Sequence, residues 1–333
     1  MKIAKYTLLV AVLGGCATLG NVTSTDEALP AAGVGPFRKL SQSEELGLPP
    51  YVLDDKASMY REPAALALDP ADETGASPSV RVALYLVVRS KTGADVIART
   101  HADDARSFYG AALDFGHSPV QVLAADQAWE GADLAGPSAL ANGGAIYLYY
   151  AGSGGIGVAT STDGFTFTKQ SGPILAPDAS ATWETAVPHA PSVAILPSGE
   201  FRMLYGAGTC IGEATSTDGV HFTRIGTSPL LCPSTTPPPP VADGATPTPT
   251  DLGGVDDPVL TPRLTPAGRL QYRVLYTEYS APVGDPSRSS AIGYAARYGD
   301  SGPLVKNAAP VYAVGKNERA PAFFQWQTGS MLY

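Results

Sequence analysis

Short, almost continuously apolar runs recur along most of this chain, separated by more polar segments. Clear examples are residues 82–88, 147–150, 203–205 and 272–276. A short apolar run bounded by turn residues is typical of a buried β-strand, and the Val, Tyr and Leu that fill these runs pack well on a pleated surface. Turn-forming residues separate the runs, with 36 Gly and 30 Pro in the chain. No stretch longer than a few turns has a helical period, so the pattern predicts an all-β protein.

Two stretches of the chain are near-copies of each other. Each contains Trp-Glu, then Pro-Ser, then a run rich in Tyr and Leu, then Ile-Gly-x-Ala-Thr-Ser-Thr-Asp-Gly. Trp129 and Trp183 lie 54 residues apart, and Gly164 and Gly219 lie 55 apart. A fixed period of this size indicates a repeat architecture. Each unit is interpreted as four short strands, with Asp-Gly supplying the hairpin turn before the fourth.

Degenerate copies of the unit extend in both directions. One begins at 62–66 upstream, another at 257–260 downstream, and a fifth opens at 320–323 but lacks its outer strands. Residues 36–40 could supply the missing outer strand. Four-stranded sheets that are apolar on both faces must stack on neighbours, and radial stacking gives a β-propeller. We therefore predict a five-bladed β-propeller over residues 36–333, with four-stranded antiparallel blades and the ring closed by the N- and C-terminal strands.

The N-terminus has the pattern of a bacterial lipoprotein signal. Lys2 and Lys5 precede an apolar run over 6–13 that is too short to span a bilayer. The run ends in Leu-Gly-Gly-Cys at 13–16, which looks like a lipobox. We expect residues 1–15 to be a signal peptide, Cys16 to be lipidated and 16–35 to be a tether. The lipid would anchor the protein in the cell envelope. Because Ala17 follows the cysteine, we expect the anchor to lie in the outer membrane. The alternative is an ordinary secretory signal with an incidental Cys16.

Two cysteines remain after Cys16. Cys210 and Cys232 flank the same predicted hairpin end, and disulfides persist in exported proteins. A disulfide between them is expected, the alternative being two unrelated buried thiols. The Pro/Thr-rich residues 233–251 favour extended conformations and cannot form a core. We interpret them as an insertion between blades rather than as a domain boundary.

The charge of the chain narrows its possible partners. The formal net charge is −9, and nucleic-acid binding requires a basic surface. We therefore expect no nucleic-acid partner, and also no cofactor and no metal. We expect the protein to be a monomer that contacts the membrane only through its lipid anchor. The acidic balance leaves a neutral glycan or an envelope protein open as the partner.

Candidate binding residues gather on one face of the predicted ring. The starts of the innermost strands and the connections between blades share that face, which would be rich in aromatic and charged side chains. Sugar rings stack on Trp, and sugar hydroxyls bond to Asp, Glu and Arg. The expected ligand-binding residues are Trp129, Trp183, His189, Asp256 and Arg319. Alternatively, the two Trp wedge between blades, and Glu130 and Glu184 beside them cap the inter-blade turns. Glu213, at a position held by Val158 in the other copy, is expected to face solvent.

The repeat pattern resembles the five-bladed propellers of the arabinanase, β-xylosidase, levansucrase and invertase superfamily. The motifs that carry the resemblance are Pro-Ser-Val, Tyr-Leu-Tyr-Tyr and Ile-Gly-x-Ala-Thr-Ser-x-Asp-Gly-x-x-Phe. The resemblance implies an Asp base or nucleophile, a Glu acid and a second Asp that tunes the acid, at the starts of successive inner strands. The corresponding positions here are Glu62, Gly136, His189-Ala190, Asp257 and Ala320.

These positions give two functional hypotheses. Glu62 and Asp257 are the candidate catalytic carboxylates, although either could simply accept backbone N–H groups. Gly136 cannot replace the tuning Asp, and His189 stands where the acid is expected. We therefore expect an envelope-anchored, glycosyl hydrolase-like propeller that binds a glycan or a partner protein and has degenerate catalytic positions. The alternative is an active glycoside hydrolase on furanoside- or xyloside-type glycans.

Overall fold

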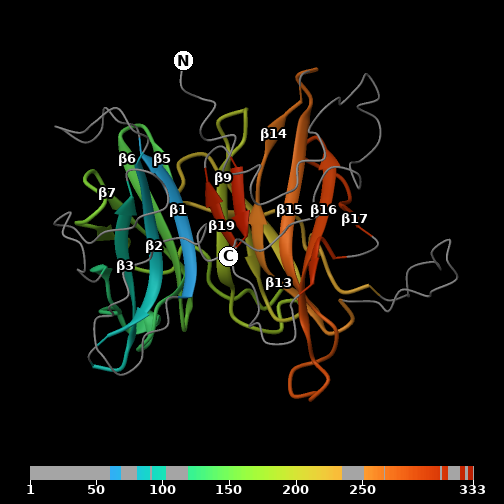
Figure 1. Cartoon of the computed structure of the whole chain (residues 1–333), viewed down its shortest axis with the longest axis horizontal. Helices are drawn as coiled ribbons and strands as arrows, with labels where there is room; N and C mark the ends of the chain where they lie inside the picture. The colour runs from blue at the N-terminus through green and yellow to red at the C-terminus, as the bar shows by residue number, and fades with distance from the viewer. Residues whose placement is uncertain are drawn as a thin grey trace, which may run out of the picture.

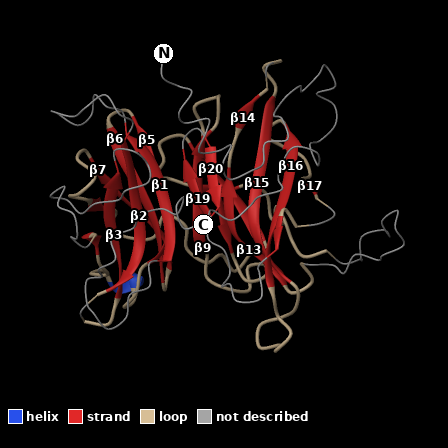
Figure 2. Cartoon of the chain, in the orientation of Figure 1, coloured by secondary structure: helices blue, strands red, loops and turns tan. Residues whose placement is uncertain are grey.

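The computed structural model describes residues 61–68, 81–90, 92–102, 119–234, 251–265, 267–307, 310–313, 323–326 and 329–332. The signal peptide, Cys16, the tether, the predicted strand at 36–40 and most of the Pro/Thr-rich insertion lie outside these ranges. In the described part of the chain almost all regular structure is β-strand (Figure 2). No helix among these residues has the length and hydropathy that a membrane span requires.

Four antiparallel sheets follow one another along the chain, and we call them blades 1 to 4. Blade 1 contains β1 (Arg61–Leu68), β2 (Arg81–Arg89), β3 (Asp95–Ala102) and β4 (Val120–Leu123). After the short 3-10 helix η1 (Ala128–Glu130), blade 2 contains β5 (Ala135–Asn142), β6 (Ala145–Gly152), β7 (Gly155–Ser161) and β8 (Thr168–Lys169). Blade 3 contains β9 (His189–Ile195), β10 (Phe201–Gly206), β11 (Ile211–Ser216) and β12 (Thr223–Arg224).

Blade 4 has the same order with two short additional strands. It contains β13 (Gly254–Leu260), β15 (Leu270–Tyr279), β16 (Ser290–Tyr298) and β17 (Val305–Lys306), with β14 (Arg263–Leu264) paired to β15 and β18 (Tyr312–Ala313) paired to β16. A final hairpin contains β19 (Phe323–Trp326) and β20 (Gly329–Leu332). The four-stranded antiparallel blades predicted from the repeat are confirmed for blades 1 to 3 and, with these additions, for blade 4.

The first strand of each blade lies innermost in the propeller. β1 contacts β5, β5 contacts β9, and β9 contacts β13. β19 in turn contacts both β13 and β1 (Figure 1). The β19–β20 hairpin therefore lies where the sequence predicts the last blade. The prediction of a fifth four-stranded blade also involves residues outside the described ranges.

The hydrophobic core lies between successive blades. Tyr85 of blade 1 packs with Leu148 and Tyr150 of blade 2, and Tyr149 of blade 2 packs with Phe201 of blade 3. All five side chains have at most 2% exposure. Blades 2 and 3 each have a neighbouring blade on both faces, and their strands are apolar on both sides.

A repeated hydrogen bond links each of the first two blades to the next. The Tyr85 hydroxyl donates to the Gly164 carbonyl in the Asp-Gly turn of blade 2, at 3.1 Å. The Tyr149 hydroxyl donates to the Gly219 carbonyl in the matching turn of blade 3, at 2.9 Å. Since the two bonds span 79 and 70 residues of sequence, these tyrosines fix one blade against the next.

Between blades 3 and 4 a buried ionic network takes over this role. Glu213 accepts hydrogen bonds from Arg202 at 2.6 Å, Tyr272 at 2.6 Å and Arg297 at 2.8 Å. The expectation that Glu213 faces solvent is therefore wrong, because the residue is only 7% exposed. The carboxylate is tolerated inside because two guanidinium groups and a hydroxyl satisfy it.

The expected disulfide between Cys210 and Cys232 is confirmed. It joins the turn before β11 to the chain that leaves blade 3. Beyond it, Ser234 bonds through its hydroxyl to Asp251 at 3.0 Å, and Lys306 forms an ion pair with Asp251 at 2.5 Å. The two ends of the Pro/Thr-rich insertion are thus held together at the edge of blade 4.

Candidate functional site

Each of the four inner strands has an unusual backbone conformation at its start. Glu62, Gly136, Ala190 and Asp257 have φ of 50°, 55°, 46° and 47°, and each precedes a proline. The strand register shifts beside each of them, as at a β-bulge. Left-handed backbone in non-glycine residues costs on the order of 1–3 kcal/mol each and is concentrated at functional sites. We call these four positions the axial slots.

The third axial slot is Ala190 rather than His189. The resemblance to the glycosidase propellers placed His189 where the acid is expected, but the positive φ and the following proline align Ala190 with Glu62, Gly136 and Asp257. His189 stands one residue earlier, in register with Asp256. The slots therefore hold Glu, Gly, Ala and Asp, in blade order.

The two slot carboxylates lie close enough to interact. Glu62 Oε2 accepts a hydrogen bond from the backbone N–H of Gly136 at 2.6 Å, which joins blade 1 to blade 2. Asp257 is a solvent-exposed residue. Desolvation by the surrounding protein, followed by the negative charges of Asp256 and Glu62, raises the pKa of Asp257 to about 7. The residue is exposed, so a ligand can reach it.

His189 and Asp256 form an ion pair between blades 3 and 4. His189 Nε2 lies 3.0 Å from Asp256 Oδ2, and its Nδ1 lies 2.9 Å from the Val187 carbonyl oxygen. A carbonyl oxygen and a carboxylate both accept, so the pair of contacts favours a doubly protonated ring. Burial opposes that charge, but the hydrogen bond and the charge of Asp256 outweigh it and raise the pKa of His189 to about 9.

This ion pair also supports the slot next to it. Asp256 Oδ1 accepts the backbone N–H of Asp257 at 2.8 Å. Gly206 of β10 lies directly against the pair, and a Cβ there would collide with the Asp256 carboxylate and lie 3.0 Å from His189 Nε2. The lack of a side chain at Gly206 thus allows His189 to reach Asp256, which in turn holds the strained backbone of Asp257.

The two repeat tryptophans lie within blades 2 and 3. The Trp129 ring stacks on Tyr150, with centroids 5.9 Å apart, and its Nε1 donates to Gln127 at 2.7 Å. The Trp183 ring packs on Tyr205, with centroids 6.0 Å apart. Both tryptophans are half-buried. Each ring contact is with a tyrosine of a single blade. The wedge between blades and the ligand-stacking role both stay predictions.

The glutamates after these tryptophans are engaged inside the protein. Glu130 has no exposed surface. It accepts the backbone N–H groups of Asp126 and Gln127 at 2.8 and 2.9 Å, as expected of a residue that caps the inter-blade turn. Glu184 pairs with Arg224 at 2.6 Å instead. Neither carboxylate is available for chemistry on a ligand.

Three residues near the axial slots do not stand out in the sequence. Thr277 of β15 pairs in register with Asp256, and Tyr279 follows two residues later on the same side of the strand. Burial, followed by the charges of Asp257 and Asp256, raises the pKa of Tyr279 to about 12. The Arg288 guanidinium lies over the Tyr279 ring, 3.7 Å from its centroid. Only the register of the blade reveals this group, since nothing in the local sequence marks it.

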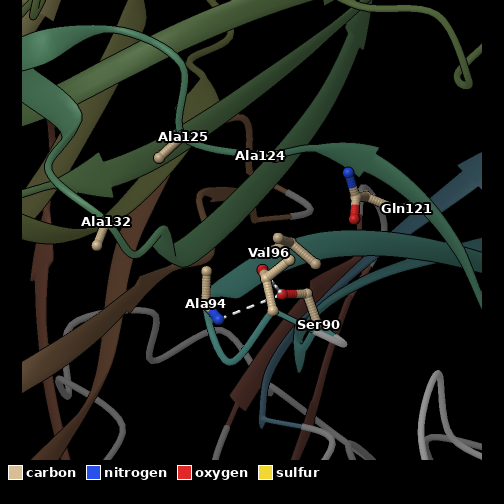
Figure 3. Close-up of a pocket in the computed structure, with 8 residues that line it drawn as sticks. Ser90, Ala94, Val96, Gln121, Ala124, Ala125 and Ala132 are labelled. Carbon is tan, nitrogen blue, oxygen red and sulfur yellow. Dashed lines mark hydrogen bonds between the residues drawn. The ribbon is translucent and has the colours of Figure 1, made fainter.

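The remaining candidates are quickly placed. Arg319 and Cys16 lie outside the described residues. Within the described ranges, no group of three or more His, Cys, Asp or Glu could hold a metal ion. A cavity of about 400 Å³ opens at the β2–β3 hairpin of blade 1, between Ser90, Val96, Gln121 and the loop at 124–132 (Figure 3). No titratable side chain lines this cavity, so we place the candidate site at the axial slots.

The comparisons with known proteins agree with the fold. No protein-family model matches the sequence, and no curated protein sequence matches it. Several solved structures do match, at low identity. One described as a glycoside hydrolase has 16% identity and a TM-score of 0.55, over 87% of this chain and 90% of its own. One from a study of the GH130 family of mannoside phosphorylases and glycoside hydrolases has 15% identity and a TM-score of 0.51, over 86% and 81%.

A third match is the sucrose-6-phosphate hydrolase of Lactobacillus gasseri, with 12% identity and a TM-score of 0.52, over 83% of this chain and 53% of its own. Identities this low establish the fold and leave the activity open. The protein is therefore a β-propeller similar in fold to these glycoside hydrolase structures.

Proposed function

We propose that this protein binds a glycan at the axial slots and hydrolyses a glycosidic bond there. The observation that carries the proposal is Asp257, an exposed carboxyl with a pKa raised to about 7 beside a second carboxylate, Glu62. Glycoside hydrolysis requires two carboxyl groups in opposite protonation states. Asp257 is partly protonated at neutral pH, and Glu62 supplies the neighbouring negative charge.

The two groups divide the reaction between them. Asp257 donates its proton to the glycosidic oxygen as the bond to the anomeric carbon breaks. Glu62 accepts a proton from the water that attacks that carbon, so one water is consumed and solvent restores both groups. The His189–Asp256 pair keeps the backbone of Asp257 in place through the bond from the Asp257 N–H to Asp256 Oδ1.

Glycan binding without turnover is the second candidate. Gly136 and Ala190 favour it, because two of the four axial slots carry no functional group. In that case Glu62 and Asp257 would only accept hydrogen bonds from sugar hydroxyls. The two candidates share a site and differ in whether a covalent bond breaks.

Purified protein assayed on aryl-glycosides, arabinan, xylan and fructan distinguishes them. We expect hydrolysis that Glu62→Gln and Asp257→Asn each reduce by at least a hundredfold, with Glu200→Gln on the surface as a matched control. Activity should fall above pH 7 as Asp257 loses its proton. Glycan binding with no hydrolysis would establish the second candidate, and turnover unaffected by both slot variants would contradict the mechanism.

The lipid anchor and the fifth blade are part of the same proposal. The Leu-Gly-Gly-Cys sequence at 13–16 supports attachment to the envelope through Cys16, and Cys16→Ser should abolish incorporation of labelled fatty acid. The contacts of β19 with both β13 and β1 support a five-bladed ring. Deleting residues 36–40 should then lower the melting temperature of the whole domain.

A further inference from the structure

Arg288, in the loop between β15 and β16, differs from three arginines of blades 3 and 4 that pair with glutamates. Arg202, Arg224 and Arg297 each form ion pairs with a glutamate at 2.5–2.8 Å. Arg288 is half-buried, yet no carboxylate of the described residues pairs with it, and its Nη1 has no hydrogen-bond partner. The nearest acidic residue in its loop, Asp285, bonds to Ser287 instead.

The Tyr279 ring holds this guanidinium in position. Arg288 lies 3.7 Å from the ring centroid, and such a cation–π contact restrains the side chain without neutralising its charge. Arg288 belongs to the loop between β15 and β16, whose ends are closed by the bond from Ser280 N–H to the Ser289 carbonyl at 3.0 Å. A restrained charge at the end of a closed hairpin costs little entropy when it binds a ligand.

The position of Tyr279 connects this charge to the axial slots. Tyr279 and Thr277 lie on the same side of β15, about 7 Å apart along the strand, and Thr277 pairs with Asp256. The electrostatic influence of Asp257 and Asp256 on the Tyr279 hydroxyl agrees with this proximity. Arg288, which lies over the Tyr279 ring, is thus close to the candidate site.

We propose that Arg288 and Tyr279 form a subsite for the carboxylate of a uronic acid, so that the glycan bound at the axial slots is an acidic one. This inference rests on the proposed glycan-binding function. A guanidinium group matches a planar carboxylate with two parallel hydrogen bonds, and the Tyr279 ring beneath it limits the approach to the plane of that fork. A neutral sugar would leave the Arg288 charge uncompensated.

The surrounding charges permit an anionic ligand at this site. Asp256 is already paired with His189 at 3.0 Å, so its negative charge is largely cancelled. Asp257 carries its proton in part near neutral pH. The Arg288 guanidinium over the Tyr279 ring adds a positive charge that no carboxylate of the described residues pairs with, so the site can accept one carboxylate of a ligand.

Calorimetry with matched ligands tests the subsite. Oligosaccharides of galacturonate, glucuronate and mannuronate are compared with their carboxyl-reduced counterparts, which have the same sugars and length but no charge. We expect at least one uronate to bind tenfold or more tightly than its reduced form. Arg288→Gln should abolish that ratio, and Arg288→Lys should retain part of it because lysine keeps the charge but loses the fork.

Arg269→Gln is the matched control, because Arg269 also stacks on a tyrosine, Tyr298, 4.3 Å from its ring centroid but on the β14–β15 side of blade 4. It should leave the ratio unchanged, and equal melting temperatures of the variants exclude misfolding. Equal binding of charged and reduced glycans would refute the subsite while leaving the glycan function intact. Preference for sulfated over uronic oligosaccharides would also refute it, and no binding of any glycan would refute both proposals.

Discussion

Replacing Glu213 by valine tests the ionic network between blades 3 and 4. Valine is the residue at the equivalent position of blade 2, Val158, so the backbone accommodates it. The change removes the acceptor for Arg202, Arg297 and Tyr272, at 2.6–2.8 Å. The two arginines are only 5% and 4% exposed. Arg297 would remain as a buried charge without a carboxylate, and Arg202 would keep only its pair with Glu200.

The cost follows from this geometry. Breaking a buried ion pair by removing one partner typically costs about 3–5 kcal/mol. Both arginines also donate to the Asp300 carbonyl, at 3.1 and 2.7 Å, so part of their hydrogen bonding survives. We therefore expect a loss of about 3 kcal/mol, which corresponds to a decrease in melting temperature of roughly 6–12 °C for a domain of this size.

Urea denaturation and calorimetry measure the effect, with Glu200→Gln as the control. Glu200 also pairs with Arg202 at 2.5 Å, but its side chain is 35% exposed, so its loss should cost less than about 1 kcal/mol. A triple variant that also replaces both arginines with leucine should recover most of the stability. If Glu213→Val costs no more than Glu200→Gln, the network does not hold the blades together.

Four further outcomes are expected. The folded-state pKa of Asp257 is raised to about 7, so the folded state holds a proton that the unfolded state releases, and the stability falls as the pH rises from about 4 to 7. Asp257→Asn should remove this dependence of stability on pH in urea titrations. An unchanged dependence would contradict the raised pKa. The pKa of His189 is raised to about 9, so the stability that its ion pair contributes is complete below about pH 6.5 and is lost as the pH rises through 9. NMR titration of the imidazole should give a midpoint near 9. A midpoint near 6.5 would rule out the pair with Asp256. The Cys210–Cys232 disulfide joins residues 22 apart, and its reduction should lower the free energy of unfolding by about 3 kcal/mol. Thermal melts with and without reductant measure the change. An unchanged melting temperature would mean that the bridge adds no stability. Tyr149→Phe should cost about 1–2 kcal/mol by leaving the buried Gly219 carbonyl unpaired, and a neutral result in denaturant melts would show that the turn relaxes.

The arrangement of blades was predictable because each strand is specified locally. The apolar run at 147–150 and the Asp-Gly turn at 163–164 indicate β6 and the β7–β8 turn without knowledge of distant residues. The 54-residue period then fixed how the units repeat. The same local rules failed at Glu213, because its burial depends on Arg297, 84 residues away, which no periodicity in the sequence reports.

The candidate site was only partly predictable. Glu62 and Asp257 stand out in the sequence because each precedes a proline at the start of a repeat, and their catalytic role stays a prediction. The sequence suggests His189 for the third slot, one residue before Ala190, because histidine is a common catalytic residue. The feature that identifies Ala190 is its positive φ, a backbone property that the sequence does not show. Tyr279 and Arg288 were missed, because their relation to Asp257 arises from strand pairing between β13 and β15.

The axial slots have a consequence for redesign. The left-handed backbone and the bulge are present at Gly136 and Ala190 as well as at the two carboxylates, so the scaffold maintains four equivalent attachment points whatever side chain they carry. Ala190 already has a Cβ in this conformation, so a longer side chain there needs no new backbone strain. Ala190→Glu would therefore add a third carboxylate at an axial slot whose backbone already has the required conformation. Such a variant could be used to introduce or alter activity.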